Sequence, residues 1–233
     1  MTQMLTTLVA GLPQLGLELD SATAEKLCAF GAAVVEQNKV MNLTAITEPE
    51  AVANLHLLDS LTVGKALPLG GKKVIDVGCG AGFPGVPLKI ANPTMELTLL
   101  DSLGKRMKWL ETVLPELGVE AQCLTARAEE AVATRRESYD VATSRAVARL
   151  PILLELTAPY VKVGGFVAAM KGTAAAEELS DSKNAIAKLG LQLYKVLEFP
   201  IADTNHTLIL LKKVKPTPAQ YPRKFAKIKQ SPL

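Results

Sequence analysis

Cysteine and histidine are scarce in this chain of 233 residues, and this scarcity excludes several kinds of site. The three cysteines, Cys28, Cys79 and Cys123, are odd in number, lie far apart and form no C-x-x-C pair. A disulfide framework or a zinc site is therefore not expected, and free thiols suit a cytoplasmic location. The chain holds only two histidines, His56 and His206, which excludes a multi-histidine metal centre. We predict no metal site.

Long hydrophobic runs are absent as well. Stretches such as Thr207–Leu211 are far too short to span a bilayer, so we expect no membrane partner. Residues 1–12 have no basic residue ahead of their apolar stretch and do not resemble a secretory signal. Hydrophobic residues at 48% and charged residues at 21% are typical of one α/β domain with an appendage, or of two small domains. No heptad pattern indicates a coiled coil, so we expect a monomer.

Acidic residues are missing from one part of the chain only. Residues 212–233 contain seven lysines and arginines and no aspartate or glutamate, while the whole chain has a net charge of +3. The positive charge is therefore concentrated at the C-terminal end, and the rest of the chain is net acidic. Such a segment is typical of a surface that binds a polyanion, although a merely solvated tail would have the same composition.

The apolar pattern changes near residue 68 and divides the chain into three parts. Residues 1–67 are predicted to be helical, since apolar residues recur there at helical spacing and no strand pattern interrupts them. Residues 68–215 alternate short β-branched runs with helical stretches, which predicts a mainly parallel sheet covered on both faces. Residues 216–233 contain four of these seven basic residues, and three prolines, Pro216, Pro218 and Pro222, lie in the first half of the segment, so we expect an extended basic tail.

Seven strands are predicted in the central part. The five that alternate with helices cover residues 72–77, 96–101, 120–125, 139–144 and 165–171. The last two, 193–199 and 207–213, follow each other with only a loop between them, so they should form an antiparallel hairpin at the sheet edge.

A glycine-rich loop directly follows the first predicted strand, at Asp76–Gly85. Glycine lets the backbone turn tightly and touch a ligand, and open α/β sheets bind ligands at this end of their strands. Two patterns fit the loop: the dinucleotide fingerprint G-x-G-x-x-G, and the D-x-G-x-G-x-G motif of S-adenosylmethionine (SAM) methyltransferases. Read from Gly78, the first glycine after the strand, the dinucleotide pattern places Phe83 where its third glycine should be. The loop therefore favours SAM.

An acidic residue, Asp101, ends the second predicted strand. A carboxylate at this position can accept hydrogen bonds from both hydroxyls of a ribose, and either ligand contains one. The alternative is that Asp101 only caps the next helix.

Longer strings in the chain resemble one family. They are DVGCGAGFPGVP at 76–87, LLDSLGKR at 99–106, RAE at 127–129, TSRAVA at 143–148 and MKG at 170–172. NLTAI at 42–46, HLLDSL at 56–61 and YPR at 221–223 fit as well. Together they resemble the bacterial 16S rRNA guanine-N7 methyltransferase family RsmG, also called glucose-inhibited division protein B, from about Gln37 to the end of the chain.

This resemblance implies a class I SAM-dependent methyltransferase fold, Rossmann-like, with a helical N-terminal extension. It implies methyl transfer from SAM to N7 of a guanine in 16S rRNA, at position 527 in the usual rRNA numbering, within the small ribosomal subunit or an assembly intermediate. The residues carried over to the cofactor site are Asp76, Gly78, Gly80, Gly82, Phe83, Asp101, Ala128, Glu129 and Arg145.

Arg145 is the candidate for orienting the reactants, because it follows the fourth predicted strand at the ligand edge of the sheet. A guanidinium there could bind the SAM carboxylate or hydrogen-bond guanine O6, but it cannot act as a base. None is needed, since N7 of guanine carries a free lone pair. A surface salt bridge is the alternative role for Arg145. His56 could hold the N-terminal helices on the main domain or help to form an RNA-binding face.

Candidate RNA contacts lie in three places. Lys105 and Arg106 begin the helix after Asp101, Lys171 follows the fifth strand, and Arg223, Lys224 and Lys227 lie in the basic tail. Phosphate contacts of this kind give affinity without sequence information. Two other functions remain open from the residues alone: a SAM methyltransferase for a small molecule, and a dinucleotide-binding oxidoreductase or binding module.

Overall fold

The computed structural model describes residues 2–202 and 204–233, and it has the predicted α/β class. Its sheet contains seven strands in the order β3-β2-β1-β4-β5-β7-β6. The strands are β1 (Lys73–Val77), β2 (Glu96–Asp101), β3 (Gln122–Thr125), β4 (Tyr139–Arg145), β5 (Val161–Lys171), β6 (Leu191–Ile201) and β7 (Thr204–Lys213). β1 to β5 are parallel to one another, and β7 runs antiparallel to both β5 and β6. The predicted edge hairpin is thus confirmed.

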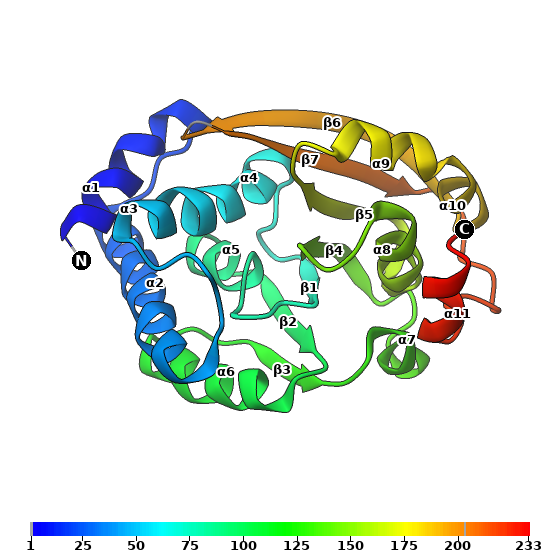
Figure 1. The fold of residues 1–233 in the computed structure, drawn as a ribbon, viewed down its shortest axis with the longest axis horizontal. Helices are drawn as coiled ribbons and strands as arrows, with labels where there is room; N and C mark the ends of the chain where they lie inside the picture. Colours follow the sequence, from blue (N-terminus) through cyan, green and yellow to red (C-terminus); the bar gives the residue numbers. More distant parts are fainter. Residues whose placement is uncertain (1, 203) are drawn as a thin grey trace.

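Helices cover both faces of the sheet (Figure 1). The α-helices are α1 (Thr2–Gly11), α2 (Ser21–Met41), α3 (Pro49–Val52), α4 (Asp59–Ala66), α5 (Gly85–Ala91), α6 (Gly104–Glu116), α7 (Ala128–Ala131), α8 (Leu150–Thr157), α9 (Ala175–Asp181), α10 (Lys183–Lys188) and α11 (Phe225–Gln230). Four short segments of other helix types are η1 (Pro13–Leu15), the π-helix η2 (Ala53–Leu58), η3 (Val132–Thr134) and η4 (Ala158–Tyr160).

Strand residues alternate between two hydrophobic cores, as the period of a β-strand requires. Val74 and Leu99 pack with the N-terminal helices and α5 and α6, whereas Ile75 and Leu100 pack with α8 and η4 on the other face. The helical extension is therefore built into one core of the sheet rather than attached as a separate body. At the ligand edge its last part, η2 and α4, lies next to β7 and the end of β4.

Several predicted boundaries differ from the structure. The apolar pattern predicts one helix over 126–136 and another over 174–189. The first stretch contains only α7 and η3, and the second is divided into α9 and α10 at Ser182. The expectation of an extended C-terminal tail is wrong. Residues 225–230 form α11, and Ile228 is fully buried. The three prolines mark where the chain turns, but they do not prevent it from packing on the domain.

In the part of the chain that the structure describes, no helix is long and apolar enough to cross a membrane.

Candidate cofactor and substrate site

The glycine loop between β1 and α5 turns on glycines in the left-handed region. Gly78, Gly80 and Gly82 have φ values of 74°, 57° and 96°, a conformation that side chains with a Cβ rarely adopt. The amide of Gly78 donates to the Leu100 carbonyl at 2.7 Å, which ties the loop to the end of β2. A Cβ added at Gly80 would meet no atom nearer than Nη1 of Arg106 at 4.0 Å. The backbone at Gly80 is therefore open to a ligand.

Asp101 lies at the rim of this open space. Its Oδ2 accepts a hydrogen bond from the Gly80 amide at 3.0 Å, and its Oδ1 accepts one from the Leu103 amide at 2.9 Å. Each carboxylate oxygen has two lone pairs, so both retain capacity for a ligand hydroxyl. The two roles considered for Asp101 thus coincide: the side chain fixes the loop and the start of α6, and it still presents acceptors.

Asp76, at the end of β1, is fully buried. Its Oδ2 accepts from the Gly85 amide at 2.8 Å, whereas Oδ1 has no partner among the described residues. Burial raises the pKa of this carboxyl to about 7, and the Gly85 amide and the positive charge of Arg145 offset only part of that effect. An unpartnered buried carboxylate oxygen is costly, and a cationic ligand group nearby would relieve the cost.

Ala128 and Glu129, the first two residues of α7, adjoin Asp101 through the backbone. The Ala126 amide donates to the Asp101 carbonyl at 3.1 Å, which places the turn before α7 at the carboxyl edge of the sheet. The Tyr160 hydroxyl also donates to the Ala128 carbonyl, at 2.6 Å. The structure thus brings the residues of β1, β2 and α7 that the family resemblance implies for the cofactor site to the carboxyl edge of the sheet.

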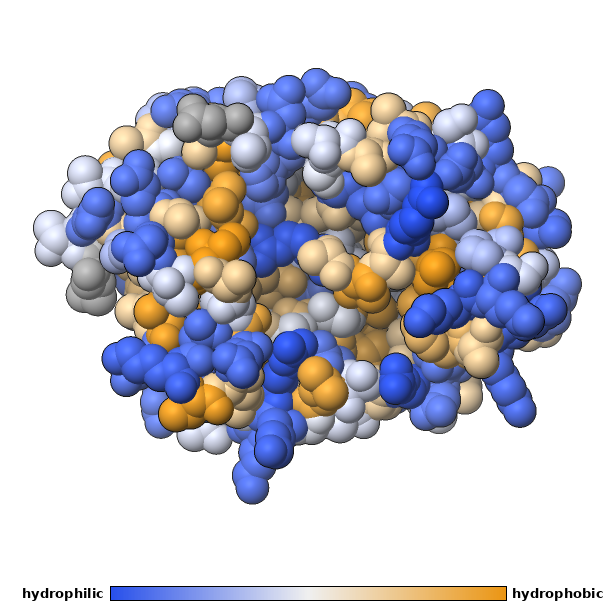
Figure 2. Space-filling view, viewed as in Figure 1, coloured by the Kyte–Doolittle hydropathy of each residue, from blue (hydrophilic) through white to orange (hydrophobic). Residues whose placement is uncertain are grey.

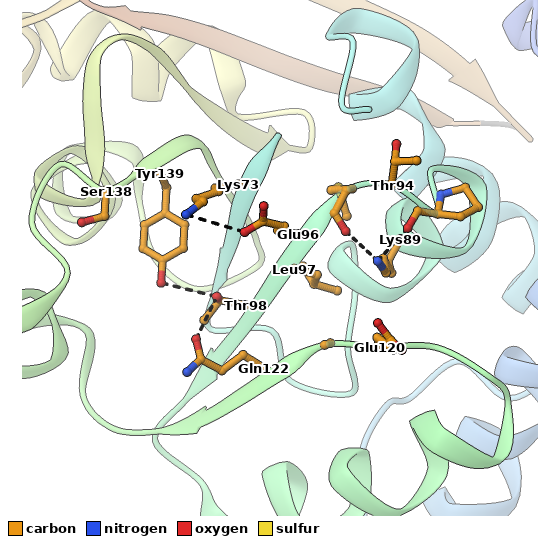
Figure 3. A pocket seen from close by; sticks show the side chains of 13 residues that line it. Lys73, Lys89, Thr94, Glu96, Leu97, Thr98, Glu120, Gln122, Ser138 and Tyr139 are labelled. Carbon is orange, nitrogen blue, oxygen red and sulfur yellow. Dashed lines mark hydrogen bonds and ion pairs between the residues drawn. The ribbon is translucent and has the colours of Figure 1, made fainter. Parts of the chain in front are cut away.

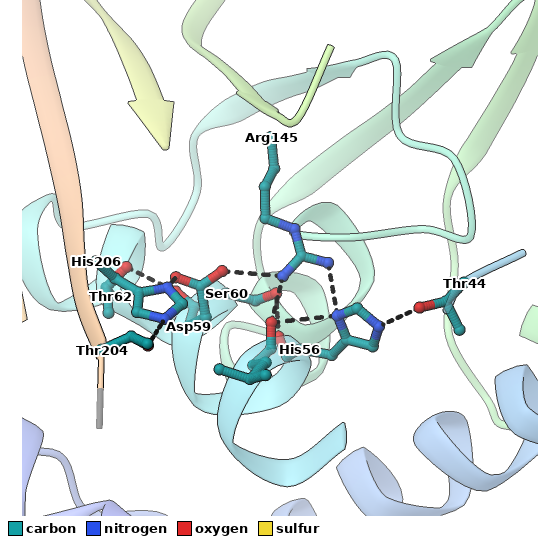
Figure 4. A network of polar contacts seen from close by, with 9 residues as sticks. Thr44, His56, Asp59, Ser60, Thr62, Arg145, Thr204 and His206 are labelled. Atoms are coloured by element: carbon teal, nitrogen blue, oxygen red, sulfur yellow. Dashed lines mark hydrogen bonds and ion pairs between the residues drawn. The ribbon is translucent and has the colours of Figure 1, made fainter. Parts of the chain in front are cut away.

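Arg145, the last residue of β4, lies at the centre of a polar network (Figure 4). Its Nη1 donates to Oδ2 of Asp59 at 2.9 Å and to the Leu55 carbonyl at 2.7 Å, and its Nη2 lies 2.9 Å from Nδ1 of His56. The other oxygen of Asp59 lies 2.8 Å from Nδ1 of His206 on β7. Arg145 therefore joins the N-terminal extension to the sheet, so the salt bridge considered as its alternative role exists, but as a partly buried one.

His56 is held as a neutral side chain in this network. Burial, and next the charge of Arg145, lower the pKa of His56 to about 4. Because the guanidinium can only donate, Nδ1 of His56 accepts, and Nε2 then donates to the Thr44 hydroxyl at 2.8 Å. The ring also stacks on Phe83 of the glycine loop, with centroids 4.5 Å apart. His56 thus has the structural role, linking the extension to the loop.

A cavity of about 720 Å³ opens beside this network. Its lining comes from the extension, the loop after β4, the end of β5 and the start of β7. Residues that line it include Leu55, His56, Asp59, Arg145, Val147, Met170 and His206. Val147 also reaches back to the glycine loop, where its Cγ2 lies 2.4 Å from the position that a Cβ of Gly78 would take. The cavity and the glycine loop are therefore separated by little more than one side chain.

The view in Figure 2 shows a face that is hollowed near its middle, with apolar residues in the hollow and hydrophilic residues around it.

A second cavity, of about 750 Å³, lies at the opposite edge of the sheet (Figure 3). It is lined by residues that begin strands, among them Lys73, Glu96, Gln122 and Tyr139. Parallel sheets bind ligands at the carboxyl ends of their strands, so this cavity is not the cofactor site.

The predicted RNA contacts fall into two groups. Lys105, Lys224 and Lys227 are exposed, and Arg106 is partly exposed at the start of α6. By contrast, Lys171 is only 8% exposed and pairs with Glu178 at 2.8 Å.

Arg223 forms hydrogen bonds through Nε and Nη2 to Glu155, which is fully buried, at 2.8 and 2.6 Å. Lys171 and Arg223 are thus both paired with carboxylates of the protein, and their contact with RNA stays a prediction.

The three cysteines are protonated thiols, and no metal-binding cluster is found among the described residues. Burial raises the pKa of the Cys28 and Cys123 thiols to about 11, and that of Cys79 well above its usual range. Cys79 in the glycine loop is thus a buried, protonated thiol that packs near Met107. Across residues 2–202 and 204–233, no three metal-ligating side chains form a cluster that could hold an ion.

Comparison with known proteins identifies the family. A model of the GidB family, described as rRNA small subunit methyltransferase G, matches residues 23–207. The chain belongs to this family. A ribosomal RNA small subunit methyltransferase G of Alkaliphilus metalliredigens is 43% identical over 229 residues, which is 96% of each chain. The protein of the same name from Desulfitobacterium hafniense is 43% identical over 94% of this chain and 93% of its own length.

Solved structures support the fold. A SAM-dependent O-methyltransferase from Thermotoga maritima has a TM-score of 0.54 at 16% identity and covers 79% of this chain and 72% of its own. A SAM-dependent methyltransferase from Aquifex aeolicus also has a TM-score of 0.54 at 16% identity, over 70% of this chain and 93% of its own. The predicted family, the methyltransferase class and SAM as the cofactor are thereby confirmed.

Sequence reasoning missed part of the site. Asp59, His206 and Thr44 converge on Arg145 and His56 from segments as much as 147 positions apart along the chain. Each is an ordinary polar residue locally, and no spacing rule connects β7 with the extension. Two signals were available: Asp59 follows His56 at the helical i+3 spacing, and Asp59 and Thr44 lie in HLLDSL and NLTAI, two of the strings that carry the family resemblance.

Proposed function

We propose that this methyltransferase transfers the methyl group of SAM to N7 of one guanine in 16S rRNA, at position 527 in the usual numbering. The observation that carries the proposal is the open glycine loop with Asp101 at its rim, in a chain whose relatives are named ribosomal RNA small subunit methyltransferase G. A small-molecule substrate has no comparable support.

The cofactor fits the residues present at the carboxyl edge of the sheet. In our placement the Asp101 carboxylate accepts from the ribose hydroxyls, and the backbone at Gly78 and Gly80 contacts the methionine part. The Oδ1 of Asp76, which has no partner among the described residues, would be compensated by the positively charged end of the ligand. Ala128 and Glu129 would lie beside the adenine. Gly82 and Phe83 support the loop from within, since both pack against Phe30 of α2.

The chemistry requires alignment rather than proton removal. Bound SAM supplies an electrophilic methyl group to a nucleophile held in line with its carbon–sulfur bond. Guanine N7 has a free lone pair, so no general base is needed. The titratable groups of the network suit this requirement: His56 uses both ring nitrogens within the protein, and Arg145 cannot accept a proton.

The target guanine would occupy the cavity beside Arg145. Its volume of about 720 Å³ lies within the usual range of small-ligand sites, and Val147 is the side chain between it and the glycine loop. A base inside a duplex cannot reach such a site, so the guanine must be unpaired or flipped out. We assign Arg145 the role of orienting the base or the methionine end, because its partly exposed side chain lines this cavity.

RNA affinity comes from cations at the rim of this edge. Lys105 and Arg106 lie next to the glycine loop, and Lys224 and Lys227 lie on the docked C-terminal segment, so they could contact phosphates on two sides of the site. A protein of this size reads little sequence by itself. We therefore propose that the substrate is folded 16S rRNA in the small subunit or an assembly intermediate, bound by a cytoplasmic monomer.

The test is methyl transfer from labelled SAM to 16S rRNA and to 30S subunits from a strain that lacks the gene. N7 methylation is mapped by borohydride and aniline strand scission, with Asp101→Ala as the inactive control. We expect one cut, at the proposed guanine. Label at another guanine would contradict the position, and no label in either substrate with SAM binding intact would favour a small-molecule substrate.

A further inference from the structure

The C-terminal segment, residues 216–233, contacts the turn before α7 at the cofactor edge of the sheet. The guanidinium of Arg127 lies over the ring of Phe225, 5.9 Å from its centroid, and Arg127 is the residue directly before α7. We propose that Phe225 is a positioning residue for SAM. By holding Arg127, it fixes the turn that presents Ala128 and Glu129. This inference rests on the placement of the adenine beside these two residues.

The turn is already fixed on its inner side. The Tyr160 hydroxyl, which belongs to a fully buried residue, donates to the Ala128 carbonyl at 2.6 Å, and the Ala126 amide donates to Asp101. On the outer side Arg127 is exposed, and a free arginine there would sample many rotamers. Stacking on Phe225 restricts the Arg127 side chain and with it the outer side of the turn.

Phe225 can act as a fixed support because the chain is anchored on both sides of it. Two residues before it, Arg223 pairs with the buried Glu155 on α8 through two side-chain hydrogen bonds. Three residues after it, Ile228 is fully buried. Figure 1 shows α11 beside α7 and α8 at the C-terminal end of the chain. The ring is thus held in place by α8, an element of the domain core.

A positioning role for Phe225 and a purely structural role for α11 predict different effects on SAM affinity. A merely structural contact would change the unfolding free energy and leave SAM affinity untouched in the folded enzyme. A positioning contact changes the Kd and KM for SAM, while kcat at saturating SAM stays close to the wild-type value, because Phe225 touches no reacting atom.

The experiment measures the Kd for SAM by isothermal titration calorimetry on the full-length chain. Loss of one exposed cation–π contact should raise the Kd about two- to five-fold in Phe225→Ala. Phe225→Tyr, which keeps the ring, should restore the wild-type Kd. Phe225→Leu keeps the apolar volume and secures the fold, and it should bind SAM as weakly as Phe225→Ala. Combining Phe225→Ala with Arg127→Ala should weaken binding no further than Arg127→Ala alone.

Two controls separate the outcomes. Lys229→Ala changes an exposed residue of α11 and should leave the Kd unchanged. Asp101→Ala tests the placement of the cofactor and should weaken SAM strongly. If Asp101→Ala weakens SAM while Phe225→Ala and Phe225→Leu bind it as wild type does, the positioning role is wrong and the placement stands. If Asp101→Ala also binds normally, the placement is wrong and the role of Phe225 falls with it.

Discussion

Asp76 is the residue whose chemistry the fold changes most. It is fully buried at the end of β1 with one oxygen unpartnered, and burial raises its pKa to about 7. A carboxyl whose pKa is raised on folding contributes stability that is present below its unfolded pKa and is lost as the pH rises through the folded pKa. Asp76 therefore costs the free protein stability at neutral and alkaline pH, where a bound cation would compensate.

The Asp76→Asn substitution should remove this loss of stability at neutral and alkaline pH in the protein without SAM. Because the amide cannot ionise, we expect the variant to exceed wild type in unfolding free energy by roughly 2–4 kcal/mol at pH 8, with little difference near pH 4. Urea unfolding at several pH values measures this. SAM should bind the variant more weakly and with a flatter pH dependence between pH 6 and 8. Equal stability of the two proteins at pH 8 would show that Asp76 is not a buried charge.

Arg145 connects three segments and has a side chain only 17% exposed. Arg145→Ala should lower turnover by at least about tenfold at saturating SAM, since it removes an orienting group. It should also destabilise the fold by about 3–5 kcal/mol, because Asp59 then retains only His206. Lys162→Ala, which removes an exposed ion pair to Asp140, is the control and should leave both unchanged. Wild-type turnover in a folded Arg145→Ala protein would reject the orienting role.

At the scale of elements, the glycine loop depends on its neighbour, the loop after β4. Gly78 has φ 74°, and a Cβ there would lie 2.4 Å from Cγ2 of Val147. Gly78→Ala should therefore destabilise the protein by more than the roughly 1–2 kcal/mol of a left-handed alanine. Adding Val147→Ala should recover the excess, which a double-mutant cycle in urea measures. If the second change recovers nothing, the two loops do not pack as described.

The C-terminal segment is held by a charge pair inside the protein. Glu155 is fully buried and accepts hydrogen bonds from Arg223, whose own pKa is raised chiefly by that bond. Arg223→Ala should cost about 3–5 kcal/mol, since it leaves a buried carboxylate unpaired. The apolar pair Arg223→Met with Glu155→Leu should recover most of it. Arg223→Ala with wild-type stability and weakened RNA binding would return Arg223 to the RNA surface.

These elements also show how far the sequence alone could reach. The short apolar runs rich in β-branched residues predicted all seven strands, because a strand buried in a sheet has a local apolar pattern in the sequence. The folded structure of residues 216–233 could not be predicted from the sequence. The few apolar residues of this segment are too sparse to indicate a helix, and α11 forms because Ile228 is buried in the folded chain and Arg223 pairs with Glu155 of α8. Likewise, the division of the helix at Ser182 and the π-helix η2 have no signal in spacing.

The site was predicted in part for a related reason. Residues that lie in a motif at the end of a strand, such as Gly80 after β1 and Asp101 at the end of β2, follow from the strand-end rule and from the family strings. The partners of Arg145 come from the extension and from β7, and only the folded chain brings Asp59 and His206 together. For the same reason the sequence could not reveal that Lys171 is paired with Glu178.

At the scale of the whole molecule, the helical extension, the sheet and the C-terminal segment meet at one edge. The extension supplies His56 and Asp59, the sheet supplies the glycine loop and Arg145, and α11 contacts the turn before α7. A base placed in the cavity beside Arg145 would lie next to the cofactor at Val147, with cations on both sides to contact the RNA. This convergence at a single edge is the physical basis of the proposed methyl transfer.

The most direct measurement is the mapped methylation of 16S rRNA and of 30S subunits that lack the modification. Purified protein and labelled SAM are added, and N7-methylated guanines are located by chemical strand scission. We expect a single new cut at guanine 527, abolished in Asp101→Ala and strongly reduced in Arg145→Ala. A protein that binds SAM but labels neither RNA would contradict the proposed function.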